Sequence, residues 1–205
     1  MDDELEFWRE FIKTDRFLNN WCSHVTNPEL CLDVRDFIIS NLGDGDRVLD
    51  CGSGVVSILH GAVPSERLVS ADLLADRYAE VFDYSAHGIE RPIAIACEDM
   101  AFDCEFGIVH ISNALDHCRD PLVSYCRLTA AVKPGGYLII QGFENEGFHE
   151  AYHGMHQWNI RVTGNGLFVS DRNGVGAALE ANVVFCKVVV PEWKPWIIWI
   201  ARKPA

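Results

Sequence analysis

The chain has 205 residues, 49% of them hydrophobic, and a formal net charge of −13, which fits a single domain over residues 1–205 with a sizeable core. The negative charge disfavours nucleic acid and anionic membranes as partners, and no apolar run reaches the roughly 18 residues that a membrane helix needs. The start Met1-Asp2-Asp3-Glu4 is unlike a signal peptide, and eight cysteines without a Cys-x-x-Cys pair fit reduced thiols, so we expect a cytoplasmic protein.

Two helices are expected within residues 1–44. Residues 4–18 carry apolar and aromatic side chains at near-helical spacing. A second helix is expected to begin at Asn27-Pro28-Glu29, with Asn as the cap and Pro in the first turn, and to end near Leu42, before Gly43. The aromatic residues of this region fit the core better than a cleft wall, although they could close a cleft: Trp8, Phe11, Phe17 and Trp21.

Strands and helices then alternate, which predicts a parallel sheet with helices on both faces. The expected strands are residues 47–50, 67–71, 92–97, 106–111 and 137–143, and the expected helices are residues 55–60, 75–84 and 120–132. The end of the chain differs, because two β-rich runs are joined by a linker too short for a crossover helix. Residues 183–190 and 196–201 therefore predict an antiparallel hairpin at a sheet edge.

The most specific motif is Asp50-Cys51-Gly52-Ser53-Gly54, directly after the first expected strand. Glycines at this spacing allow a tight turn and a close approach of the backbone to a ligand. Asp50 is a poor neighbour for the pyrophosphate of a dinucleotide. It suits a ligand with a cationic amino group and no phosphate, such as S-adenosylmethionine. Taken alone, the Gly-x-Gly pattern fits an ordinary strand–helix turn equally well.

Acidic residues follow the next two strands. Asp72, before Leu73, could accept both ribose hydroxyls of an adenosine, and with the glycine loop this role is favoured over a solvated cap. After the third strand, Glu98 or Asp99 could bind an adenine amino group while Met100 packs on the ring. The sequence does not decide between the two carboxylates, although Glu98 sits directly after the strand, and a turn with solvated charges is the plain alternative.

Asn113 to Pro121 follow the fourth strand, and ligands of open parallel sheets bind outside the carboxyl ends of strands. Asn113, Asp116 and His117 are therefore expected at the ligand-binding edge. His117 could be a general base, because the unperturbed pKa of histidine lies near neutrality. An orienting role within its own loop is equally well supported.

Together these residues resemble class I S-adenosylmethionine-dependent methyltransferases, and within them the methyltransferase type 11 group. The resemblance covers residues 45–145 and rests on the glycine loop, Asp72, residues 113–121 and Val132-Lys133-Pro134-Gly135-Gly136. It implies a three-layer, Rossmann-like, seven-stranded α/β sheet of order 3-2-1-4-5-7-6 with strand seven antiparallel. It also implies S-adenosylmethionine as cofactor. Two departures are Val56, in place of a third loop glycine, and Gly107 in strand four.

Residues 146–182 are expected to form a lid or substrate wall between the cofactor core (residues 45–145) and the hairpin (residues 183–205). His153, Gln157, Trp158 and Asn159 could shape a polar acceptor pocket, and His156 is a second candidate base. His149-Glu150-Ala151-Tyr152-His153 matches the His-Glu-x-x-His pattern of zinc proteases. The parallel-sheet context argues against a protease, so we expect no metal site.

The sequence thus favours methyl transfer from S-adenosylmethionine to an oxygen or nitrogen of a small or carbohydrate-like acceptor. Alternatives are a catalytically silent module that binds the same cofactor, or a protein that binds metal through His149 and His153. A nicotinamide dehydrogenase is opposed by Asp50 and by Ser57, which stands where the last glycine of a dinucleotide loop belongs. The acceptor and the oligomeric state are not indicated.

Overall fold

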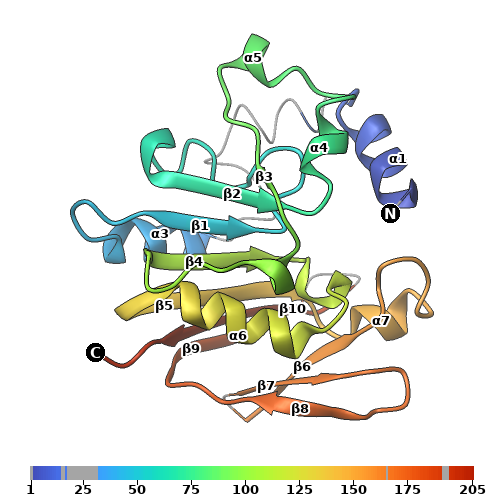
Figure 1. Cartoon of the computed structure of the whole chain (residues 1–205). Coiled ribbons are helices and arrows are strands. Elements are labelled where there is room, and N and C mark those ends of the chain that lie inside the picture. The colour runs from blue at the N-terminus through green and yellow to red at the C-terminus, as the bar shows by residue number, and fades with distance from the viewer. Residues whose placement is uncertain (1, 15–16, 18–31, 165, 191–193) are drawn as a thin grey trace.

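The centre of the protein is a seven-stranded sheet, seen in a computed structural model that describes residues 2–14, 17, 32–164, 166–190 and 194–205. The strand order is β3-β2-β1-β4-β5-β10-β9 (Figure 1). β10 pairs antiparallel with both of its neighbours, whereas β1 to β5 are parallel. The predicted order and the antiparallel seventh strand are confirmed. The strands are β1 (Val48–Cys51), β2 (Leu68–Asp72), β3 (Ile93–Ala94), β4 (Phe106–Ser112), β5 (Val132–Phe143), β9 (Val183–Val189) and β10 (Trp196–Arg202).

Helices cover both faces of this sheet, which gives the predicted three layers (Figure 1). Leu128 of α6 packs in one apolar cluster with Trp199 of β10. Val34 and Ile38 of α3 pack in a second cluster with Ile198 of the same strand. Neighbouring residues of a strand point to opposite faces, so the two clusters lie on the two sides of the sheet. The helices are α1 (Asp2–Phe11), α3 (Leu32–Asn41), α4 (Ala75–Tyr78), α5 (Tyr84–His87), α6 (Pro121–Ala131) and α7 (Glu146–His149).

Helix α6 begins as its sequence predicts. The Asp120 side chain accepts hydrogen bonds from the backbone N–H groups of Leu122 and Val123, and Pro121 occupies the first turn. A capping carboxylate satisfies amide groups that have no partner within the helix. The start of this helix therefore fixes the end of the preceding loop, which carries Asp116 and His117.

A second, three-stranded antiparallel sheet forms where the sequence predicted a lid. It consists of β6 (Asn159–Thr163), β7 (Gly166–Ser170) and β8 (Gly176–Leu179). Its buried residues Ile160, Leu167 and Val169 belong to the apolar cluster that α6 covers. Most of residues 159–179 is therefore a layer of the core, and only residues 146–156 remain as a candidate wall of a site.

Several predicted boundaries are wrong. No helix forms at residues 55–60, where the chain makes bends and turns instead, because Ser57 bonds Asp50 and the backbone N–H of Leu59. The helix expected at residues 75–84 shortens to α4, and β3 has only two residues. Asn27-Pro28-Glu29, Trp21 and residues 191–193 lie outside the described residues. Within the described part of the chain, no helix is long and apolar enough to cross a bilayer.

Candidate functional site

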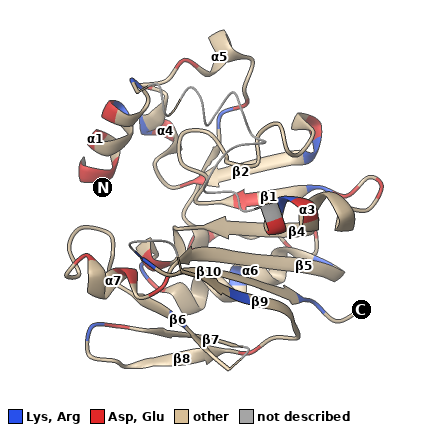
Figure 2. Ribbon diagram, turned by 180° about the vertical axis from the view of Figure 1, so that it is seen from behind, with Lys and Arg blue, Asp and Glu red and all other residues tan. Residues whose placement is uncertain are grey.

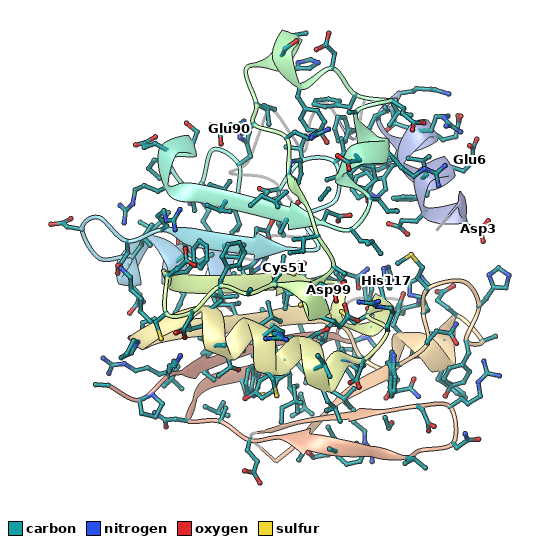
Figure 3. All side chains as sticks on the ribbon, in the orientation of Figure 1. Asp3, Glu6, Cys51, Glu90, Asp99 and His117 are labelled. Atoms are coloured by element: carbon teal, nitrogen blue, oxygen red, sulfur yellow. The ribbon has the colours of Figure 1, made fainter. Side chains whose placement is uncertain are left out.

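A cavity of about 850 Å³ opens at the carboxyl ends of β1, β2 and β4. Parallel sheets bind ligands at this edge, and the volume is typical of small-molecule sites. The glycine loop forms one part of its wall, and α1 and the turn after α7 form others (Figure 1). Cys51 and His117, both labelled in Figure 3, belong to the wall.

Most of the predicted site residues lie in this wall, and some do not. Those in the wall are Asp50, Gly52, Ser53, Gly54, Asp72, Leu73, Glu98, Asn113, His117 and His156. Those outside it are Asp99, Met100, His153, Gln157, Trp158 and Asn159. The structure therefore gathers the residues that follow strand ends and leaves out most of those predicted in the 153–159 segment.

The two loop glycines are required by their conformation and by their neighbours. Both have a φ of +65°, a region that residues with a side chain rarely adopt. A Cβ atom on Gly52 would lie 2.4 Å from the Cβ of Ala114, and one on Gly54 would lie 2.4 Å from the Trp8 ring. The backbone N–H groups of Gly52 and Ser53 donate to the Ala71 carbonyl, which ties the loop to β2.

Asp72 holds the glycine loop from the end of β2. Its carboxylate accepts hydrogen bonds from the backbone N–H groups of Gly54 at 2.9 Å and Leu74 at 2.8 Å. Burial raises the pKa of Asp72, and the hydrogen bonds from Leu74 and Gly54 offset part of that rise. Burial and the nearby Asp72 charge raise the pKa of Tyr78 above its usual range. Tyr78 joins Asp72 in the cavity wall and was not predicted there.

Asp50 belongs to a buried polar chain, which differs from the free carboxylate that the sequence suggested. Its Oδ1 lies 2.7 Å from His110 Nδ1, and its Oδ2 accepts from Ser57 Oγ at 2.5 Å. His110 Nε2 lies 3.0 Å from Gln141 Nε2, and the Gln141 Oε1 atom accepts from Trp196 at 3.4 Å. Asp50 thus connects the start of the glycine loop to β4 through His110. Its direct contact with a ligand's amino group stays a prediction.

The structure separates the three residues expected around an adenine ring. Glu98 lies in the cavity wall and accepts a hydrogen bond from the backbone N–H of Asp120 at 3.1 Å. Asp99 instead pairs with Arg119 at 2.9 Å and is largely exposed. Met100 is buried in the core. Of the two carboxylates in the turn Cys97–Asp99, only Glu98 lines the cavity, and Met100 does not line it.

Asp116, His117 and His156 meet at the opposite end of the cavity from α1. The His117 Nε2 and His156 Nδ1 atoms are 3.0 Å apart, and Asp116 Oδ2 lies 2.8 Å from His156 Nδ1. Burial lowers the pKa of His156, but the hydrogen bond and charge of Asp116, together with the charges of Glu146 and Glu150, raise it more, so the net shift is upward. The structure therefore brings both candidate bases together, beside a carboxylate.

Three residues predicted to contact an acceptor stabilise the 146–159 segment instead. The Gln157 side chain donates to the carbonyls of Tyr152 and Gly154. Trp158 donates from Nε1 to the Cys118 carbonyl at 2.9 Å, and Asn159 is buried and bonds Tyr152 and Phe148. A tight turn has backbone groups that need partners, and these polar side chains supply them. His153, the fourth, is exposed.

The His-Glu-x-x-His segment does not form the helix that a zinc protease needs. Helix α7 ends at His149, and Ala151 and Tyr152 have φ values of +53° and +56°. His149 and His153 therefore do not share a helical face. Glu150 bonds Lys194, which also bonds Glu146.

Helix α1 supplies a part of the wall that the sequence reading assigned to the core. Glu4, Phe7, Trp8 and Phe11 line the cavity, and Trp8 Nε1 donates to Glu4 at 3.0 Å. Phe17 is in the core, as predicted, and Leu5 lies there too. The helical spacing of the aromatic residues indicates a helix with an apolar face, but it does not show which residues of that helix face a ligand. Glu146, Met155 and Trp196 also line the cavity and had no such signal.

No family model and no curated protein matches this sequence, so the finer likeness to methyltransferase type 11 stays a prediction. A S-adenosylmethionine-dependent methyltransferase from Clostridium acetobutylicum ATCC 824 is similar over 98% of each chain, with 11% identity and a TM-score of 0.57. The 1,6-didemethyltoxoflavin-N1-methyltransferase of Burkholderia thailandensis, solved with 1,6-didemethyltoxoflavin and S-adenosylhomocysteine bound, has 16% identity and a TM-score of 0.51 over 96% of this chain and 90% of that one. The cyclase SpnF has 13% identity and a TM-score of 0.56 over 84% of this chain and 80% of its own. The chain therefore has the fold of S-adenosylmethionine-dependent methyltransferases.

Proposed function

We propose, from this shared fold, that the chain binds S-adenosylmethionine and transfers its methyl group to an oxygen or nitrogen of a small acceptor. The observation that carries the proposal is the junction of Asp72 with the Gly52–Gly54 turn inside the cavity. In this proposal the Asp72 carboxylate accepts the ribose hydroxyls, and the glycine turn lies beside them. In this pose Glu98 is near the adenine, and the sulfonium points toward Asn113 and His117.

The charge of the cavity wall supports a cationic donor over a dinucleotide. Among the described residues of the wall, Arg119 is the only lysine or arginine. Six residues of the wall carry carboxylates, namely Glu4, Asp50, Asp72, Glu98, Glu146 and Glu150. Acidic residues are also dense at the start of α1, which borders the cavity (Figure 2). Such a wall attracts a sulfonium and an ammonium group and repels pyrophosphate.

The reaction is an in-line displacement. A lone pair of the acceptor forms a bond to the methyl carbon, the carbon–sulfur bond breaks, and its electron pair stays on sulfur, which gives S-adenosylhomocysteine. The acceptor loses a proton. Because the donor is already activated by its charge, the protein mainly aligns the reactants and excludes water. His117 and His156 act at the acceptor end, where one of them orients the acceptor or helps remove its proton.

A second candidate function is a module that uses the same fold without methyl transfer. This alternative is supported by the structural similarity to SpnF, which is described as a cyclase. Both candidates bind the cofactor, so binding alone does not separate them. Release of S-adenosylhomocysteine during incubation with S-adenosylmethionine and a panel of amines and alcohols separates them, because only a methyltransferase produces it in proportion to an acceptor.

Asp72→Ala is expected to weaken S-adenosylhomocysteine binding by about 1–3 kcal/mol, the scale for losing a charged hydrogen-bond partner, or roughly 5- to 150-fold in Kd. The change removes both the ribose partner and the bond that holds Gly54. Isothermal titration calorimetry measures it. Asp76→Ala is the matched control, because Asp76 is exposed on α4, pairs with Arg91 and lies outside the cavity wall. Equal affinities of the two variants would refute the role of Asp72.

A further inference from the structure

We propose that Asp116, His117 and His156 form a binding site for one divalent first-row transition metal ion, such as Zn²⁺. Three potential ligand atoms converge there, namely Asp116 Oδ2, His117 Nε2 and His156 Nδ1. They come from two segments about forty residues apart, the turn Leu115–His117 after β4 and the turn after α7. This proposal departs from the sequence-based expectation of no metal site, for which His149, His153 and His156 were the ligands weighed; of these only His156 belongs to the cluster.

The separations between the three atoms match those of ligands around one ion. Bonds of 2.0–2.2 Å from zinc to nitrogen or carboxylate oxygen place neighbouring ligand atoms about 3.0–3.5 Å apart in tetrahedral or octahedral geometry. In this cluster the separations are 3.0 Å between the two nitrogens, and 2.8 Å and 3.5 Å from the Asp116 oxygen to His156 and His117. Two imidazoles and one carboxylate are also a ligand set that transition metals use, with positions left open for substrate.

Hydrogen bonds satisfy this arrangement only if the three residues share protons at one place. Each ring nitrogen offers one in-plane site, either a proton or a lone pair. The Nδ1 atom of His156 faces both the Asp116 oxygen and the Nε2 atom of His117. Its proton is then shared between Asp116 and His117, or both rings donate to the same Asp116 oxygen, from 2.8 Å and 3.5 Å. A cation at the centre accepts one lone pair from each of the three atoms at once.

The cluster is held in place before any ion binds. Asp116 is buried, with 3% of its surface exposed. The two segments are tied together by the Gln157 backbone N–H, which donates to the Asp116 carbonyl at 3.3 Å, and by the bond from Trp158 to Cys118. Ligands fixed by their surroundings lose little freedom on binding an ion.

The surroundings favour positive charge and leave access from the cavity. Both histidines line the cavity, so positions on an ion there would be open to a substrate atom. Glu146, which is buried in the same wall, has an Oε2 atom that is without a hydrogen-bond partner within the described part of the chain. Its charge and that of Glu150 act on His156. Lys194 pairs with both carboxylates and offsets one of their charges, but with Asp116 the local charge stays negative, which suits a divalent cation.

An ion at this place would act on the acceptor. This role rests on the proposed methyl transfer, but the binding of the metal ion is independent of it. A bound cation lowers the pKa of a coordinated hydroxyl group, so the acceptor would release its proton to solvent before its oxygen attacks the methyl carbon. His117 and His156 then act as ligands that place the acceptor. In this arrangement the two histidines orient the acceptor and do not act as general bases.

Zinc titration of tag-free protein, stripped with a chelator and dialysed, tests the site. We expect about one Zn²⁺ per chain with a Kd tighter than about 10 μM, and visible d–d absorption when Co²⁺ replaces zinc. His156→Ala should weaken binding roughly 100-fold or more, since it removes one of three ligands. His149→Ala is the matched control, because His149 is an exposed histidine of the same segment and lies outside the cluster.

S-adenosylhomocysteine affinity, measured on the same preparations, separates this inference from the proposed function. His156→Ala should lose zinc and keep the sulfur ligand, and Asp72→Ala should do the reverse. Zinc far below one ion per chain, or equal loss in His149→Ala and His156→Ala, would overturn the metal site. If His156→Ala does not fold, Asp116→Asn replaces it, and the Co²⁺ spectrum of the unchanged protein decides without any variant.

Discussion

Gly52→Ala is expected to abolish measurable S-adenosylhomocysteine binding, with a loss of roughly 100-fold or more. The added Cβ would lie 2.4 Å from the Cβ of Ala114, which is about 1 Å too close for two carbon atoms. The glycine loop and the turn after β4 must separate to relieve the clash, and a displacement of about 1 Å in a binding site can cost 100-fold. Calorimetric titration of the folded variant measures the effect.

Gly88→Ala is the matched control for Gly52→Ala. Gly88 has a φ of +64°, close to that of Gly52, but a Cβ there meets no atom within 4 Å. Both variants should lose about 1–2 kcal/mol of stability from the left-handed conformation. Only Gly52→Ala should lose the ligand. If Gly52→Ala binds S-adenosylhomocysteine as tightly as Gly88→Ala does, the loop is not the cofactor site.

His110→Phe is expected to lower the free energy of unfolding by about 3 kcal/mol, the scale for leaving a buried hydrogen-bonding group without its partner. His110 is 0% exposed and Asp50 is 2% exposed. The variant keeps the volume of the ring but removes the Asp50 partner and leaves Gln141 Nε2 without its contact to His110. Urea denaturation of variant and wild type measures the difference. The exposed His149→Phe should change stability by less than about 0.5 kcal/mol.

A double variant tests whether the unpaired carboxylate causes this loss. Replacing Asp50 by Leu in the His110→Phe background removes the group left without its partner, and replacing both partners of a buried hydrogen bond by apolar groups can be nearly neutral. The double variant should therefore be more stable than His110→Phe alone. A double variant that is less stable by the sum of both single effects would show that the two residues act independently.

The sheet could be predicted because its signals are local and its topology follows from connection lengths. The alternation after residue 47 indicates parallel strands, and the short linker before Trp196 leaves only an antiparallel last strand. The β6–β8 sheet was not predicted, because its strands have only four or five residues each. They lie in the segment that was predicted to form a lid. The absent helix at residues 55–60 depends on the Ser57–Asp50 bond, which forms only in the folded chain.

The site could be predicted where a residue directly follows a strand, because the fold fixes that position. Gly52 and Asn113 directly follow β1 and β4, and Asp72 is the last residue of β2. Residues in longer connections could not be placed, since a turn decides which side chain faces the cavity. His156 faces it, whereas the neighbouring Gln157 and Trp158 bond the backbone of their surroundings. The partner of Asp50 was also hidden, because His110 lies sixty residues away and meets it only through strand pairing.

Calorimetric titration of the unchanged protein with S-adenosylhomocysteine tests the central claim most directly. We expect binding at micromolar Kd, in about one site per chain, and no binding of nicotinamide adenine dinucleotide under the same conditions. The acidic wall and the glycine loop held by Asp72 are the reasons for both results. Folded protein that shows neither heat nor a thermal shift with S-adenosylhomocysteine and S-adenosylmethionine, or that binds the dinucleotide instead, would contradict the account.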